Sequence, residues 1–194
     1  MEPSRFTRLT FLFAATSAFQ PSSIPIRHRF PSTASPRSLG IRSMTSGPFP
    51  ELTVFDLDAC FWDQEMYTLS KIPSENNVVM GDLNGRGEGV TGVMSGRSRI
   101  SLHPGSLLAL QAHHDEKYPH MKVCFASSAD TPLAEQIGRA TLKLLEVVPG
   151  TTVWDLVVGR DWGGEDVNQI GRQPPLSANK SATHFPMLRE LTRV

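Results

Sequence analysis

The chain has 194 residues and a formal net charge of zero, with 19 lysines and arginines against 19 aspartates and glutamates. This length suits one domain, the neutral balance argues against a broad nucleic-acid-binding surface, and two cysteines are too few for a disulfide scaffold. The sequence has no run of about 18 apolar residues, so we predict no ordinary transmembrane helix.

The neutral total hides two parts of opposite charge. Residues 1–48 carry six arginines and one glutamate, a net charge of +5, whereas the remaining residues carry 13 basic and 18 acidic side chains, a net charge of −5. We therefore separate a predicted targeting leader, residues 1–48, from a predicted folded domain, residues 49–194.

The leader has two segments with different compositions. Residues 1–18 have the order of a signal peptide, with two arginines, a short apolar run and small residues that suit cleavage. Residues 19–48 contain four arginines, no acid and many serines and prolines, as transit peptides do. In series, with Phe19 after the cleavage site, they resemble the bipartite plastid leaders of algae with secondary plastids. We expect a plastid location; a disordered tail, or a cytoplasmic protein translated from Met44, is the alternative.

The first half of the folded part is rich in short β-type patterns. Residues 52–55 form an apolar run that predicts a buried strand. Within residues 61–100, apolar runs at 78–80 and 90–94 flank a glycine-rich stretch, which predicts a β-hairpin with a flexible tip. Residues 99–102 predict a further short strand.

Strands and helices alternate in the second half. The predicted elements are a helix from Pro104, a strand at 121–126, a helix at 132–146 capped by Thr131, a strand at 153–158, a loop at 160–175 and a helix at 181–192. Because such alternation favours parallel strands joined by right-handed crossovers, we predict a layered α/β fold.

Two aspartates, Asp56 and Asp58, directly follow the first predicted strand. Ligands of α/β sheets lie at the carboxyl ends of the strands, and side chains two residues apart on an extended chain share one side. Two close carboxylates repel each other, which favours either a bound cation or a raised pKa of one of them. One can then act as nucleophile and metal ligand and the other as general acid and base. The alternative is that both cap backbone groups at a turn.

Three further polar residues follow later predicted strands. Ser127 and Ser128 come after the second strand, where a hydroxyl near a helix entrance can hold a phosphate oxygen. Lys180 precedes the last helix and can neutralise a phosphate or an aspartate as a point charge. The alternatives are an N-cap for the serines and an ordinary surface position for the lysine.

Three segments in this order resemble three of the four motifs of the haloacid dehalogenase superfamily. They are residues 53–62 (TVFDLDACFW), residues 101–105 (SLHPG) and residues 179–185 (NKSATHF). The likeness is closest to the magnesium-dependent phosphatase type with a minimal cap, and it covers about residues 50–191. It implies a Rossmann-like three-layer α/β fold with a parallel sheet and a small β-hairpin cap at about residues 61–100.

This resemblance implies a phosphoric monoester hydrolase. Asp56 would be the nucleophile that forms an aspartyl-phosphate, Asp58 the general acid and base, Ser127 a ligand of the phosphoryl group, and Lys180 the partner of Asp56. Mg²⁺ would bind the Asp56 carboxylate and the Asp58 backbone carbonyl. The substrate would be a phosphorylated small molecule or a phosphoprotein, and neither a nucleic acid nor, for the mature form, a membrane is expected as a partner.

Two features depart from the family pattern. Ser128 stands where the family commonly has an arginine, so one phosphate contact differs. The fourth motif, an acidic pair after a further strand, has no counterpart before the end at Val194, so we expect the last strand or strands of the fold to be missing. Three explanations stay open: a truncated product of a full phosphatase, which we favour, a degenerate relative that binds without hydrolysis, or another acid that completes the metal site.

Four histidines near Cys124 could suggest a metal cluster. Their spacing fits no zinc pattern, so we interpret them as part of a solvated helix end. They are His103, His113, His114 and His120.

Overall fold

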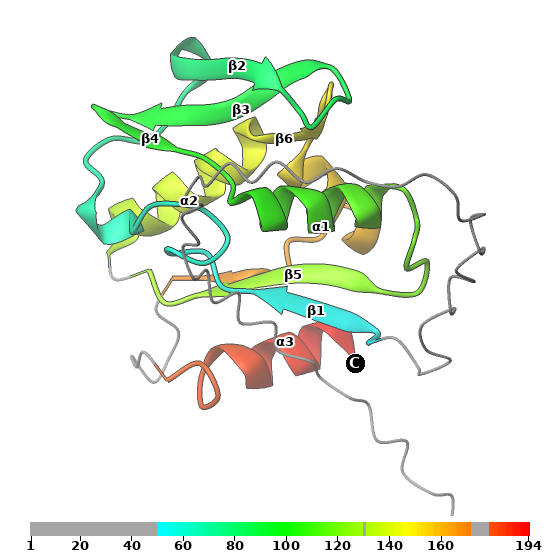
Figure 1. Ribbon diagram of the computed structural model, residues 1–194. Helices are drawn as coiled ribbons and strands as arrows, with labels where there is room; N and C mark the ends of the chain where they lie inside the picture. The colour runs from blue at the N-terminus through cyan, green and yellow to red at the C-terminus, as the bar shows by residue number, and fades with distance from the viewer. Residues whose placement is uncertain (1–49, 130, 172–178) are drawn as a thin grey trace, which may run out of the picture. The chain divides into compact units, whose positions relative to one another are not determined.

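The structure is a computed structural model that describes residues 50–129, 131–171 and 179–194 (Figure 1). The predicted leader, residues 1–48, lies outside this part of the chain, and the plastid location therefore stays a prediction. No helix among the described residues combines the length and the apolar character needed to cross a membrane.

A parallel sheet lies at the centre of the described domain. Its strands are β1 (Leu52–Phe55), β5 (Lys122–Ser127) and β8 (Gln169–Ile170), in the order β1-β5-β8. Phe55 of β1 pairs with Phe125 of β5. The predicted α/β class with a parallel sheet is thus confirmed, and the first two strands lie where the sequence pattern predicts them.

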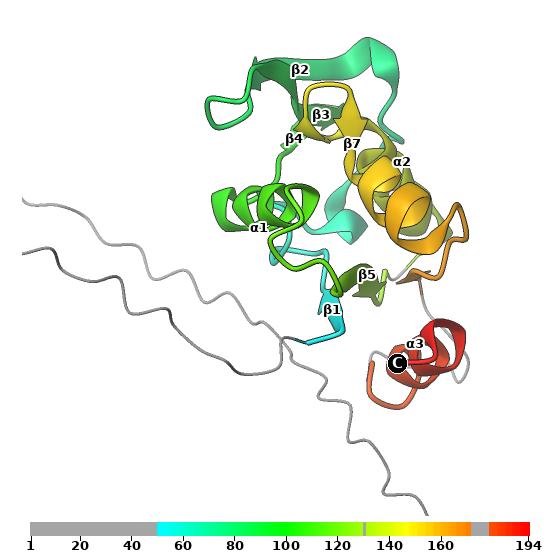
Figure 2. The ribbon, with the colours of Figure 1, turned by 90° about the vertical axis from the view of Figure 1, so that its right-hand side faces the viewer.

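Three α-helices flank this sheet, and they are α1 (Pro104–His114), α2 (Pro132–Leu144) and α3 (His184–Thr192). Figure 2 shows α3 on the opposite side of β1 and β5 from α1 and α2. Side chains alternate along a strand, and accordingly Val123 and Phe125 pack into the core that includes Leu110 of α1 and Ile137 of α2. Cys124 and Ala126 join the second core with Leu188 of α3. The β-strand alternation therefore builds the three predicted layers.

The start of α2 follows the predicted capping pattern. Thr131 has an extended backbone, and its Oγ1 accepts a hydrogen bond from the Ala134 amide at 3.1 Å. Pro132 occupies the first turn, where no amide hydrogen is needed. This cap fixes the point at which the chain turns from the end of β5 into the helix.

The segment predicted as a small cap forms an antiparallel sheet. It contains the short helices η1 (Met66–Thr68) and η2 (Glu75–Asn77) and the strands β2 (Val78–Asp82), β3 (Glu88–Ser95) and β4 (Ser98–Ile100), in the order β2-β3-β4. The hairpin tip, predicted to be flexible, is tied to α1. Arg86 forms two hydrogen bonds of 2.7 and 2.6 Å with Asp115, and Asn84 Nδ2 donates to Gln111 Oε1 at 3.1 Å.

The predicted third strand at residues 153–158 is wrong. These residues lead into a π-helix, η3 (Asp155–Asp161), after a small hairpin of β6 (Glu146–Val148) and β7 (Thr151–Thr152). A short apolar run suits a buried helix as well as a strand, and Leu156, Val157 and Val158 are all buried. The third parallel strand is β8, within the predicted loop, and its two residues are too few to give a hydrophobic pattern.

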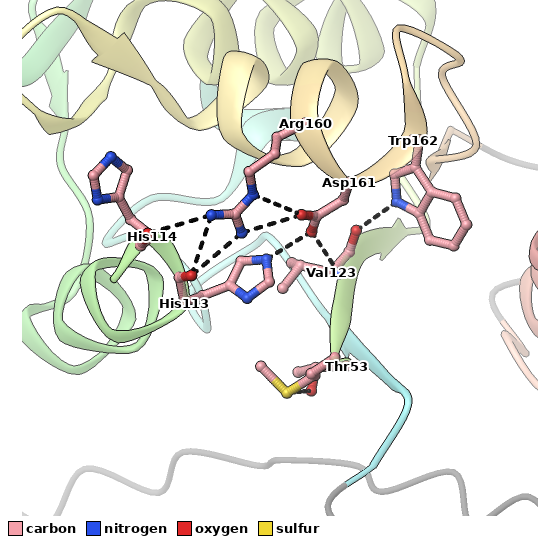
Figure 3. Close-up of polar contacts among 8 residues, drawn as sticks. Thr53, His113, His114, Val123, Arg160, Asp161 and Trp162 are labelled. Carbon is pink, nitrogen blue, oxygen red and sulfur yellow. Dashed lines mark hydrogen bonds and ion pairs between the residues drawn. The ribbon is translucent and has the colours of Figure 1, made fainter. Parts of the chain in front are cut away.

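The amino end of β5 is held by a cluster of polar contacts in which His113 and Asp161 are buried and Arg160 is exposed (Figure 3). His113 Nε2 lies 2.7 Å from Asp161 Oδ2, and the two side chains are only 3% and 5% exposed. Asp161 Oδ2 also accepts a hydrogen bond from the Val123 amide at 3.0 Å, and the Arg160 guanidinium donates to Asp161 Oδ1 and to the His113 carbonyl. The interpretation of these histidines as a solvated helix end is therefore wrong for His113, because η3 covers it.

We expect Asp161→Asn to lower the free energy of unfolding by about 2 kcal/mol, because a buried charged acceptor loses part of its hydrogen bonding. Urea denaturation measures this change. Glu165→Gln, a charge-removing change at an exposed side chain, is the matched control and should leave stability within about 0.5 kcal/mol. Equal stabilities of Asp161→Asn and the wild type would show that the cluster does not hold the strand.

Candidate active site

The predicted site residues gather at the carboxyl edge of the parallel sheet. Asp56 follows Phe55, the last residue of β1, and Ser127 is the last residue of β5. The register pairs Phe55 with Phe125 and Ser127 with Ile170. Both polar side chains therefore leave neighbouring strands at the same edge, which is where α/β sheets bind their ligands.

Lys180 joins this edge from a distant part of the sequence. Its Nζ forms an ion pair with Asp56 Oδ1, and the Lys180 and Asp56 side chains are 20% and 44% exposed. The Phe185 amide donates to the Lys180 carbonyl at 2.9 Å, which ties the turn that carries the lysine to the start of α3. The pair is accessible on the aspartate side, so a ligand can reach the carboxylate.

A tight loop presents Asp58 beside Asp56. The Leu57 carbonyl accepts hydrogen bonds from the Phe61 and Trp62 amides at 3.0 and 3.3 Å, and Ala59 adopts a left-handed backbone with φ of 49°. Phe61 and Trp62 are fully buried and act as anchors for this loop. The Phe61 ring lies 4.9 Å from the ring of Phe125, with an edge-on geometry that favours aromatic contact.

The Asp58 carboxylate is partly withdrawn from solvent. Burial is the main cause that raises the pKa of Asp58 to about 6, and the negative charges of Glu65 and Asp56 add to the rise. A hydrogen bond from the Met66 amide to Asp58 Oδ1, at 3.1 Å, acts in the opposite direction. Asp58 can therefore hold a proton at mildly acidic pH and give it up near neutrality, as a general acid and base must.

Ser127 and Ser128 bring unused hydroxyls to the same strand end. The Oγ atoms of both serines are buried, and neither finds a hydrogen-bond partner within the described residues. Ser127 as a whole is 1% exposed. A buried polar atom without a partner costs free energy, so these two hydroxyls are available to an additional acceptor or donor at this edge.

The donor atoms at this edge suit a hard cation. Mg²⁺ prefers oxygen ligands and keeps several waters, so one or two protein oxygens together with a phosphate are sufficient. The Asp56 carboxylate and the Asp58 backbone carbonyl are of that type. Among residues 50–129, 131–171 and 179–194, no group of three or more His, Cys, Asp or Glu side chains could enclose a metal ion, so such a cation would depend on its waters and on the substrate.

Two residues at the site were not assigned a role from the sequence. Glu65 affects the charge of Asp58, and nothing in the sequence pattern points to it, because it lies in an irregular segment. His184 belongs to the segment around Lys180, is fully buried, and contacts the carbonyl of Ser127. The position of His184 four residues after Lys180 is the one feature of the sequence that indicates a role at the site.

We expect Asp58→Asn to be more stable than the wild type above pH 6 and equally stable below pH 4. A folded-state pKa of Asp58 above the ordinary aspartate value of 3.8 means that ionisation of Asp58 destabilises the fold as pH rises through about 4 to 6. The amide still accepts from the Met66 amide, and the expected gain is about 1 kcal/mol because solvent partly screens the site. Thermal unfolding of both proteins at several pH values measures this gain. A stability difference that does not change with pH would contradict the raised pKa of Asp58.

Comparison with curated proteins and with solved structures found no significant match. The model of one protein family, described as Acid Phosphatase, matches residues 48–193. This match spans the parallel sheet, the antiparallel sheet β2-β3-β4 and the edge that carries Asp56, Asp58, Ser127 and Lys180. It agrees with the haloacid dehalogenase-like architecture, and the chain belongs to the Acid Phosphatase family.

Proposed function

We propose that the protein is a magnesium-dependent phosphatase that hydrolyses phosphate monoesters through an aspartyl-phosphate at Asp56. The observation that carries this proposal is the pairing of Asp56 with Lys180 beside the unpartnered hydroxyl of Ser127. A carboxylate nucleophile, a cation and free hydroxyl groups at one edge are what a transferring phosphoryl group requires. Phosphoryl transfer depends mainly on positioning and on stabilising spread negative charge.

In the first step, an oxygen of the Asp56 carboxylate attacks phosphorus. The bond between phosphorus and the ester oxygen breaks, and the leaving oxygen takes the proton held by Asp58. Lys180 and the hydroxyls of Ser127 and Ser128 offset the negative charge on the phosphoryl oxygens. The products of this step are the free alcohol and an acyl phosphate on Asp56.

In the second step, water attacks the same phosphorus atom. Asp58, now ionised, accepts a proton from that water as it attacks, and the bond between phosphorus and the Asp56 oxygen breaks. Inorganic phosphate leaves, and both aspartates return to their starting states. The partial burial of Asp58 supports this double use, because its pKa of about 6 lies close to the working range of an acid and base near neutrality.

Mg²⁺, held by the Asp56 carboxylate and the Asp58 carbonyl, would neutralise charge on the phosphate. The Asp56 side chain is 44% exposed, which supports an open site and a phosphorylated small molecule or phosphoprotein side chain as substrate. The residues of this chain would orient the phosphate and hold the acid proton at Asp58.

We expect Asp56→Asn to abolish hydrolysis of 4-nitrophenyl phosphate, because an amide cannot form the acyl phosphate. Release of nitrophenolate measures the rate. Glu51→Gln, at an exposed position just before β1, is the matched control and should retain wild-type rates. Turnover that survives in Asp56→Asn would refute the nucleophile, and phosphate binding by a wild type without turnover would favour a non-catalytic binding module.

We also expect hydrolysis to require added Mg²⁺. Treatment with EDTA should remove activity and excess Mg²⁺ should restore it, whereas Ca²⁺ should not, because its larger and looser coordination suits the site poorly. The same assay measures both additions, and thermal unfolding checks that EDTA leaves the protein folded. Full activity after exhaustive chelation would exclude the metal from this proposal.

A further inference from the structure

His184, the first residue of α3, lies at the junction of the segments that form the candidate site. Its side chain is fully buried. A fully buried imidazole is tolerated when its two ring nitrogens find partners, and each nitrogen of His184 contacts a different segment of the chain. The two contacts explain why a polar residue occupies this place in the core.

The Nε2 side of the ring joins two strands. Nε2 lies 3.1 Å from the Ser127 carbonyl oxygen and 2.7 Å from the Gly171 carbonyl oxygen. Carbonyl oxygens only accept, so Nε2 carries the hydrogen and donates toward both. The Ser127 carbonyl also accepts from the Gly171 amide at 2.9 Å. Because β8 has only two residues, this donor reinforces the pairing of β5 and β8 at the residue that carries the buried Ser127 hydroxyl.

The Nδ1 side of the ring joins the turn that carries Lys180. Nδ1 lies 2.7 Å from Thr183 Oγ1, and Thr183 Oγ1 lies 3.0 Å from the Asn179 carbonyl oxygen. With the ring hydrogen on Nε2, Nδ1 accepts from the Thr183 hydroxyl, whose single hydrogen also lies within reach of the Asn179 carbonyl. The ring and the first residue of the turn therefore meet at Thr183, directly before α3. Lys180 lies within this turn and reaches Asp56 from it.

We infer that His184 is a positioning residue of the phosphatase site, which sets the Ser127 strand end and the Lys180 turn at a fixed separation. The inference rests on the proposed function. A rigid ring with hydrogen-bonding groups at opposite ends transmits the position of one segment to the other, as a flexible side chain does not. His184 itself contacts neither Asp56 nor Asp58; it acts through the lysine and the serine. Small displacements of such groups reduce catalysis strongly.

The test compares His184→Ala, His184→Gln and the control His113→Gln in the full chain. His113 is another buried histidine, but it contacts Asp161 near the amino end of β5, away from the candidate site. We expect His184→Ala to lower kcat for 4-nitrophenyl phosphate by about 100-fold with a much smaller change in KM. His184→Gln, which retains an N–H donor for the carbonyls, should recover about tenfold of this loss. His113→Gln should lower the Tm and leave the kcat of the folded protein unchanged.

A folded His184→Ala protein with wild-type kcat would overturn the inference, as would an equal fall of kcat in His113→Gln. If His184→Ala does not fold, Thr183→Val removes the hydroxyl that contacts both the ring and the Asn179 carbonyl. We expect it to lower kcat by about tenfold with a Tm close to that of the wild type, and an unchanged kcat would overturn the inference.

A wild type without phosphatase activity would refute the proposed function. The positioning role of His184 is then tested by a measurement that does not depend on activity. Hydrogen exchange at the Phe185 amide, which donates to the Lys180 carbonyl, provides it. Faster exchange in Thr183→Val than in the wild type would show that the ring holds the lysine turn, and identical exchange would overturn that part of the inference as well.

Discussion

The ion pair between Asp56 and Lys180 offsets part of the negative charge that the carboxylates of Asp56 and Asp58 place at one edge of the sheet. Two carboxylates, those of Asp56 and Asp58, follow the last residue of β1 at one edge of the sheet, and burial together with neighbouring acids disfavours the ionised form of Asp58. A cation at Asp56 compensates for part of the negative charge there. That cation arrives from a turn far along the sequence, so the fold must bring α3 and the end of β1 together before the site exists.

The polar side chains at the two ends of the parallel sheet differ in their contacts. At the amino end of β5, the buried Asp161 carboxylate is satisfied by His113, the exposed Arg160 and the Val123 amide, whereas Nδ1 of His113 has no hydrogen-bond partner within the described residues. At the carboxyl end, the hydroxyls of Ser127 and Ser128 lack partners within the described part of the chain. A buried polar group without a partner needs a physical explanation, and for the two adjacent hydroxyls at the carboxyl end the proposed phosphate ligand supplies one.

The sequence predicts the starts of α1 and α2 well because the residues that begin these helices are local signals. A proline at the start of α1 and a Thr-Pro pair at the start of α2 set both helices at the positions where they occur. The resemblance to the haloacid dehalogenase motifs also implies that Lys180 pairs with Asp56, and the structure brings these two residues together.

The later elements could not be predicted for physical reasons. The apolar residues of η3 are buried on a π-helix, and an apolar run alone does not distinguish this from a strand. β8 is two residues long and is held by tertiary contacts, such as the hydrogen bond from the Phe125 amide to Asn168 Oδ1 at 2.8 Å. The burial of His113 depends on Asp161, which the helix brings over it, and no local pattern around the histidine encodes that contact.

The most direct test of the central claim is to trap the covalent intermediate. The protein is mixed with 4-nitrophenyl phosphate and Mg²⁺, quenched in acid and reduced with borohydride, which converts an aspartyl-phosphate into homoserine. Peptide mass spectrometry then locates the modified residue. We expect homoserine at position 56 and at no other aspartate position; turnover without this modification, or a phosphate attached to Ser127, Ser128 or a histidine, would contradict Asp56 as the nucleophile.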